Sequence, residues 1–125
     1  MESFKFPYEK LEVWQDVRQL VKEIYSITRR FPSEEKFGIT NQINRAAISV
    51  APNLAEGSSR IGLKDQAHFT QLAYSSLMEL TCQLNLTCDL GLIEETKFQE
   101  MRRTLSVIAN KLNALRKSQL NRAQQ

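Results

Sequence analysis

Few residues in this sequence have the chemistry of a catalytic or metal site, and they do not converge. His68 is the only histidine, and we expect it to be a polar residue at a helix start or on the surface. Cys82 and Cys88 are six residues apart, on different faces of a helix, so we predict buried free thiols without a disulfide or metal site. Gly57 and Gly62 follow a helix rather than a strand, unlike a phosphate-binding loop. The sequence therefore predicts no enzyme, no cofactor and no metal.

A polar face on the second predicted helix is the first unusual feature. Its side chains are Gln42, Arg45, Ser49, Asn53 and Glu56, opposite a row of apolar residues. Asn53 and Glu56 are neighbours at a spacing of three, whereas Arg45 and Glu56 are three turns apart and do not touch within one helix. Three interpretations remain open: a solvated face, a polar network that meets another helix or subunit, and a ligand site.

A basic segment at the C-terminal end is the second unusual feature. From Thr96 onward, seven basic side chains stand against the single acid Glu100, a net charge of +6, whereas residues 1–95 carry ten basic and thirteen acidic side chains, a net charge of −3. The candidate nucleic-acid contacts are Arg102, Arg103, Lys111, Arg116, Lys117 and Arg122. Clustered cations give salt-dependent affinity for phosphates. These cations occupy more than one helix face and have no aromatic cluster beside them for base stacking. A solvated basic helix and a surface for RNA or DNA both remain open.

The elements that carry these residues are predicted to be helices. Apolar residues recur at steps of three and four, which predicts helices over about 8–30, 34–57, 64–90 and 94–118. Ser33 is the expected cap of the second helix, Gly57 and Gly91 are the expected helix ends, and Pro52 is expected to bend its helix. Residues 121–125 are expected to fray. Short connections between long helices predict a single domain over residues 1–125, an all-α, up-and-down antiparallel four-helix bundle.

Two of these helices carry a second apolar stripe. These stripes are Val13, Leu20 and Ile27 on the first helix and Tyr74, Met78 and Cys82 on the third. Surplus apolar surface marks either a wide core within one chain or a contact between subunits, and both remain open. No stretch approaches the ~20 apolar residues of a membrane span, and the N-terminus lacks a signal pattern, so we expect a cytoplasmic protein without membrane contact.

Three stretches of the sequence resemble a known family. They are FPYEKLEVWQ at residues 6–15, EEKFGITNQI at 34–43 and RAAISVAPNLAEG at 45–57, and the aromatic and Leu-Glu-Leu pattern of residues 69–80 adds to them. These features resemble the bacterial four-helix bundle proteins named after intervening sequences in 23S ribosomal RNA. The resemblance covers residues 4–93 and reaches the fourth helix only through its periodicity.

The resemblance implies a ring-like homopentamer with no established enzymatic activity. A related bundle family, the accessory variability proteins of diversity-generating retroelements, is also pentameric and binds nucleic acid and a reverse transcriptase. The recurring polar positions of the family fall on Arg45, Asn53 and Glu56. Together with the basic helix, the resemblance predicts a non-enzymatic homo-oligomer that contacts RNA or DNA through basic surfaces. The alternative is a scaffold that binds a protein partner and no nucleic acid.

Overall fold

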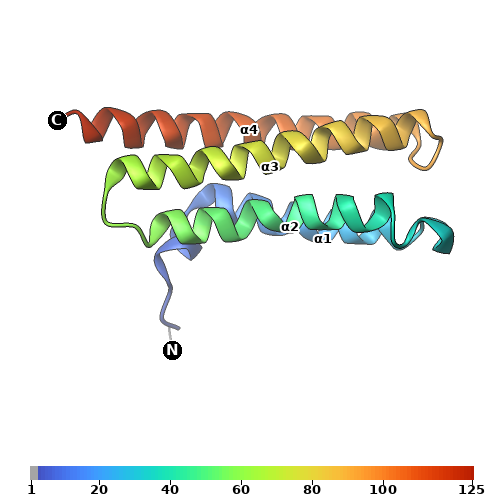
Figure 1. The fold of residues 1–125 in the computed structure, drawn as a ribbon, viewed down its shortest axis with the longest axis horizontal. Coiled ribbons are helices and arrows are strands. Elements are labelled where there is room, and N and C mark those ends of the chain that lie inside the picture. Colours follow the sequence, from blue (N-terminus) through green and yellow to red (C-terminus); the bar gives the residue numbers. More distant parts are fainter. Residues whose placement is uncertain (1–2) are drawn as a thin grey trace.

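The structure is a computed structural model that describes residues 3–125, and every regular element in that range is helical. Two short 3-10 helices, η1 (Pro7–Lys10) and η2 (Ser33–Glu35), accompany four long helices, α1 (Glu12–Thr28), α2 (Ile39–Ser58), α3 (Leu63–Asp89) and α4 (Glu95–Ala123). Consecutive helices run antiparallel and pack side by side, and α4 returns to contact α1 (Figure 1). This arrangement confirms the predicted all-α class and the four helices.

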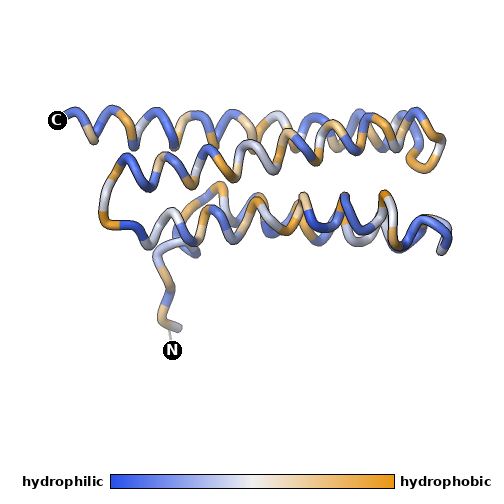
Figure 2. The backbone as a smooth tube through the Cα atoms, in the orientation of Figure 1, coloured by the Kyte–Doolittle hydropathy of each residue, from blue (hydrophilic) through white to orange (hydrophobic). Residues whose placement is uncertain are grey.

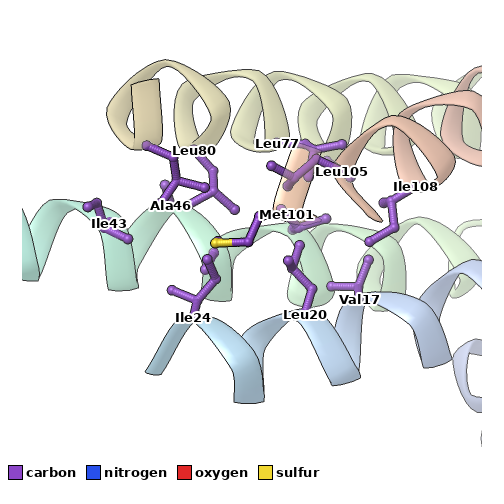
Figure 3. Close-up of a cluster of buried hydrophobic side chains, with 14 of the residues drawn as sticks. Val17, Leu20, Ile24, Ile43, Ala46, Leu77, Leu80, Met101, Leu105 and Ile108 are labelled. Carbon is purple, nitrogen blue, oxygen red and sulfur yellow. The ribbon is translucent and has the colours of Figure 1, made fainter. Parts of the chain in front are cut away.

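One continuous apolar core joins the four long helices. Its central members include Val17, Leu20, Ile24, Ile43, Leu77, Leu80, Met101, Leu105 and Ile108 (Figure 3). Polar and apolar residues alternate along each helix rather than forming blocks, as expected when one side of each helix lies in a core (Figure 2). Burial of this apolar surface is the main source of the stability of the bundle.

The second apolar stripes contribute mostly to this same core. Val13 and Leu20 are buried in it, Ile27, Tyr74 and Met78 are partly buried against it, and Cys82 is exposed. A wide core within one chain therefore accounts for most of the surplus apolar surface that the sequence indicated.

Two α-helices begin later than the sequence predicted. Residues 7–10 form the 3-10 helix η1, and Leu11 then adopts an extended conformation (φ −76°, ψ 123°), so α1 begins at Glu12 instead of residue 8. Gly38 likewise has a non-helical conformation (φ −111°, ψ −115°), which delays α2 to Ile39. Ser33 lies in η2, six residues before the first residue of α2, so its predicted role as the cap of that helix was wrong.

The C-terminal end of α3 has a glycine-based cap, as predicted. Gly91 has a positive φ of +78°, which glycine adopts without steric cost. Its N–H donates to the Cys88 carbonyl at 3.0 Å, and the N–H of Leu92 donates to the Thr87 carbonyl at 3.1 Å. These two hydrogen bonds satisfy the last carbonyls of the helix in a Schellman motif.

Gly57 has a different role from the one predicted. It lies inside α2, which continues to Ser58, so it is not the residue that ends the helix. A Cβ atom at this position would lie only 2.9 Å from the Cβ of Phe69 on α3. Gly57 therefore permits the close approach of α2 and α3 next to the loop that joins them.

The C-terminal segment remains helical further than predicted. α4 continues to Ala123 because Gln119, a polar residue in an otherwise apolar row, is buried with a partner. The hydroxyl of Thr70 on α3 donates to the side-chain carbonyl of Gln119 at 2.8 Å. The helix therefore includes residues 121–123 of the segment that was expected to fray. Between residues 3 and 125, no helix has the length and apolar character needed to cross a membrane.

Candidate nucleic-acid interface

The residues with metal or nucleophile chemistry form no site. Within the described range, no three His, Cys, Asp or Glu side chains lie close enough to hold a metal ion, and His68 is exposed. Both cysteines are free, but Cys82 is exposed and Cys88 only partly buried, so the prediction of buried thiols was wrong. The thiol of Cys88 donates to a carboxylate oxygen of Glu95 at 3.2 Å, and this hydrogen bond is the main reason why the pKa of Cys88 is raised.

The polar face of α2 does not form a network of its own members. Gln42 and Arg45 are exposed. The Ser49 hydroxyl donates to a backbone carbonyl of its own helix at 3.0 Å, and the Asn53 amide donates to the carbonyl of Ser49 at 2.9 Å. Glu56 pairs at 3.0 Å with an arginine one turn further on. The members of this face therefore bond locally, and Arg45 and Glu56 do not meet.

Two lysines of α4 are paired with carboxylates of α1. The ammonium of Lys111 lies 2.6 Å from an oxygen of Asp16 and 2.8 Å from one of Glu12. Asp16 first, and then Glu12, raise the pKa of Lys111 above its ordinary value. Lys97 lies 3.2 Å from Glu23, which raises its pKa in the same way. Because α1 offsets these charges, they tie two helices together and add little to a basic surface.

The middle of α4 borders a shallow cavity on its α3 side. Arg102 lies over the ring of Phe98, with its guanidinium carbon 5.6 Å from the ring centre. Both line a cavity of about 220 Å³ whose walls also include Met78, Leu105 and Asn85. Arg102 and Arg103 are both exposed. The cavity combines an apolar floor with a few polar groups and one cation.

The last turns of α4 carry cations that have no acidic partner in residues 3–125. Arg116, Lys117 and Arg122 make no ion pair with any described carboxylate. The guanidinium of Arg122 donates only to the backbone carbonyl of Ser118, at 3.4 Å. Of the six cations singled out by the sequence, Arg102 and Arg103 also make no ion pair within residues 3–125, and the three at the C-terminal end of α4 form the larger unpaired group.

Antiparallel packing places further cations at the same end of the bundle as these three. The N-terminal segment, the α2–α3 loop and the C-terminal turns of α4 lie toward the same end of the bundle (Figure 1). Pro7, Ser58 and Gln66 line one shallow cavity together with Gln119 and Arg122, which shows that these segments adjoin. We call residues 3–12, 56–66 and 115–125 the terminal end. Its basic side chains are Lys5, Lys10, Arg60, Lys64, Arg116, Lys117 and Arg122, and its acidic ones are Glu9, Glu12, Glu56 and Asp65.

The acidic side chains of the terminal end are already engaged. Arg60 lies 3.0 Å from Glu56 and 3.7 Å from Asp65. Glu9 accepts a backbone N–H hydrogen bond at 2.9 Å, and Glu12 is paired with the lysine of α4 described above. The remaining cations at this end, on three separate segments, have no carboxylate partner among the described residues. An anionic ligand would meet them without displacing an internal ion pair.

Comparison with known proteins agrees with this fold and assigns a family. Residues 9–114 match the family described as 23S rRNA-intervening sequence protein. A crystal structure of a protein with unknown function from the S23 ribosomal protein family of Bacteroides thetaiotaomicron VPI-5482 superposes with a TM-score of 0.62 at 18% identity, covering 90% of this chain and 99% of that chain. A comparison with curated protein sequences gives no match. Since the family match spans most of the sequence, this four-helix chain belongs to the 23S rRNA-intervening sequence protein family.

Proposed function

We propose that this chain is a non-enzymatic, nucleic-acid-binding subunit of a homo-oligomer, and that its terminal end contacts phosphates. The observation that carries the proposal is the group of cations at this end that lack a carboxylate partner in residues 3–125, above all Arg116, Lys117 and Arg122. Neither the family description nor that of the crystal structure names an enzymatic activity.

Phosphate binding by such a surface follows from counterion release. Each cation that neutralises a phosphate releases a condensed counterion, so affinity falls linearly with salt on a logarithmic scale. Arg116, Lys117 and Arg122 lie within two turns of one helix, and Lys5 and Lys10 add charge from the N-terminal segment. The cations are on a helix and short turns without a groove-reading element, so we expect affinity for the backbone and little sequence preference.

The oligomeric part of the proposal rests on the α3–α4 surface. Leu86 and Val107 are about half exposed on these two helices, which also border a shallow cavity lined by the partly buried Met78 and the buried Phe98 and Leu105. A second copy packed there would cover this apolar surface. A closed ring, a pentamer by family resemblance, would present several terminal ends together and so increase the avidity for one nucleic-acid chain.

Binding measured over a range of salt concentrations tests the proposal. Fluorescence anisotropy with a labelled RNA of mixed sequence, from 50 to 300 mM salt, gives both the affinity and its salt dependence. The triple variant Arg116→Gln, Lys117→Gln, Arg122→Gln should bind at least tenfold more weakly at 50 mM salt, and its salt slope should fall by about 2, since each contact with a single strand contributes about 0.7.

The matched control neutralises three cations at the opposite end, Arg29→Gln, Arg30→Gln and Lys36→Gln. It should leave both affinity and slope unchanged, because these residues lie outside the terminal end. Equal weakening by both triple variants, or no binding by the wild type at 50 mM salt, would contradict the nucleic-acid proposal. A protein partner that stays bound after nuclease treatment would then favour the scaffold instead. Light scattering tests the oligomeric state separately, since the mass of a single chain in solution would contradict the proposed homo-oligomer.

A further inference from the structure

Four aromatic rings form a continuous ladder at the terminal end. The rings of Phe4 and Phe6 meet edge to face with centres 5.2 Å apart, and Phe6 lies nearly parallel to Tyr8 at 6.1 Å. Tyr8 meets Trp14 edge to face at 4.8 Å, and the Arg18 guanidinium carbon lies 5.7 Å from the centre of the Trp14 ring. The prediction of no aromatic cluster beside the cations of the fourth helix did not extend to this segment, although an aromatic residue at every second position from Phe4 to Tyr8 is a visible signal in the sequence.

The outer rings of this ladder face solvent. Phe4 is 79% exposed and Phe6 53% exposed, whereas Trp14 is packed against the core. Exposing apolar rings is unfavourable, and adjacent exposed rings of this kind mark a binding surface. Nothing else in residues 3–125 covers them.

Local hydrogen bonds hold the base of the ladder in place. The backbone N–H of Phe6 donates to the Glu9 carboxylate at 2.9 Å, and the Gln15 side chain donates to the Glu9 carbonyl at 3.0 Å. Pro7 lines one shallow cavity together with Gln119 and Arg122 of the last turns of α4. The aromatic segment is therefore attached to the bundle next to the cations of the terminal end.

Two lysines lie beside the outermost of these rings. Phe4 lines an open hollow together with Lys5 and Lys10, and Arg122 of α4 borders the cavity that contains Pro7. An apolar partner would gain nothing from these charges. A single-stranded nucleic acid offers a polyanionic backbone for the cations and unpaired base faces for the rings. The bases of a duplex, by contrast, are already stacked on one another.

We propose that Phe4 and Phe6 are a stacking platform for unpaired bases, so that the terminal end binds single-stranded in preference to double-stranded nucleic acid. This inference rests on the proposed function, since the neighbouring cations supply the phosphate contacts. It adds a second kind of contact whose strength depends on base exposure and not on salt.

A pair of aromatic substitutions separates the two kinds of contact. Phe4→Ala with Phe6→Ala should weaken binding of a labelled 12-nucleotide single-stranded RNA at least tenfold. This double variant should bind the corresponding blunt duplex as tightly as the wild type does. The salt slope should also be unchanged for both probes, because the cations remain. Phe4→Trp with Phe6→Trp should preserve the single-strand affinity. Phe37→Ala is the matched control: Phe37 is 89% exposed and also has a lysine over its ring, but it lies at the opposite end, so this variant should bind normally.

The possible failures are distinguishable. Unchanged single-strand affinity in the Phe4→Ala, Phe6→Ala variant would overturn the stacking platform, while salt-dependent wild-type binding would leave the proposed function intact. Absence of RNA binding by the wild type at 50 mM salt would overturn both. A smaller mass in light scattering for the alanine variant, with single-strand affinity retained, would assign the rings to a contact between subunits and would also overturn the platform.

Discussion

The two ends of the bundle are built from the same four helices but differ in charge and in exposed chemistry. The terminal end has more basic than acidic side chains, and its acids are engaged in local contacts. We call residues 28–38 and 88–100 the distal end. Its basic side chains are Arg29, Arg30, Lys36 and Lys97, and its acidic ones are Glu34, Glu35, Asp89, Glu94, Glu95 and Glu100. One end is thus net basic with adjacent exposed aromatic rings, and the other is net acidic with the single exposed ring of Phe37.

This difference shows which properties the fold constrains and which it leaves free. The core needs apolar residues at steps of three and four in every helix, and both ends satisfy that need. The core does not determine which charged residues lie at the two ends. The separation of basic from acidic residues along the long axis of the bundle is therefore a property of the surface residues. The sequence showed an excess of cations on one helix. The fold converts that excess into a basic end, because α1 offsets Lys97 and Lys111 and leaves the last turns of α4 unpaired.

The largest expected effect breaks the packing of the terminal end. Gly57→Ala would place a Cβ 2.9 Å from that of Phe69, which cannot move without separating α2 and α3. We expect the free energy of unfolding to fall by about 2 kcal/mol, as for other overpacked helix contacts. Urea unfolding measures this change. Gly62→Ala is the control, since no atom lies within 4 Å of a Cβ there, and an equal loss in both variants would contradict the packing explanation.

The next effect compares one buried polar contact at each end. Gln119→Ala removes the closer of the two hydrogen-bond partners of Thr70 and leaves a small void, so we expect a loss of about 1.5 kcal/mol in unfolding free energy. At the other end, the Thr28 hydroxyl lies 2.9 Å from the Asn44 side chain, which is only partly buried, so Asn44→Ala should cost about 1 kcal/mol. Thermal unfolding of both variants shows which substitution lowers the stability more. A larger loss for Asn44→Ala would show that Gln119 contributes little to the last turns of α4.

A pH series tests the ion pairs that join α4 to α1. The pKa of Lys111 is raised in the folded state, so its pairing stabilises the protein below pH 10.5, and the contribution is lost as the pH rises through the folded-state pKa. The urea midpoint of the wild type should therefore fall more between pH 9 and 11.5 than that of Lys111→Gln. Lys97→Gln should show the same sign at the distal end. A wild type and variants with parallel pH profiles would show that solvent screens these exposed pairs.

The smallest expected effect concerns the reactivity of a thiol at the distal end. The hydrogen bond to Glu95 raises the pKa of Cys88, so at pH 8.5 a smaller fraction is thiolate and alkylation by iodoacetamide should be slower than at the exposed Cys82. Glu95→Gln should accelerate alkylation of Cys88 and leave Cys82 unchanged. Mass spectrometry of labelled peptides resolves the two rates, and no acceleration in the variant would show that burial alone protects the thiol.

The sequence predicted the helices and the core well, because both depend on local periodicity. Val17, Ile24 and Leu77 could be placed in the core from spacing alone. The roles of Gly57 and Gln119 could not, since each depends on a neighbour distant in sequence. Phe69 is twelve residues from Gly57, and Thr70 is 49 residues from Gln119.

The candidate site was predictable only in part. The excess of cations on α4 was visible, but their division into paired and unpaired groups depends on which acids of α1 lie opposite them. The later starts of α1 and α2 could not be predicted from periodicity either. The extended Leu11 and the non-helical Gly38 interrupt segments whose residues otherwise favour a helix. Aromatic residues on the N-terminal segment became relevant only once the fold placed them at the same end of the bundle as the C-terminal turns (Figure 1).

The two lysines of α4 that pair with α1 also favour one alignment of these two helices along their axes. Lys97 and Lys111 are fourteen residues apart, about 21 Å along the helix axis, and each meets its own carboxylate on α1. Apolar helices can slide past one another by a turn, about 5.4 Å, and still bury similar side chains. Such a slip would part Lys97 from Glu23 and Lys111 from Asp16 together. The paired charges therefore select one longitudinal register for α4, and with it how far the C-terminal turns project at the basic end.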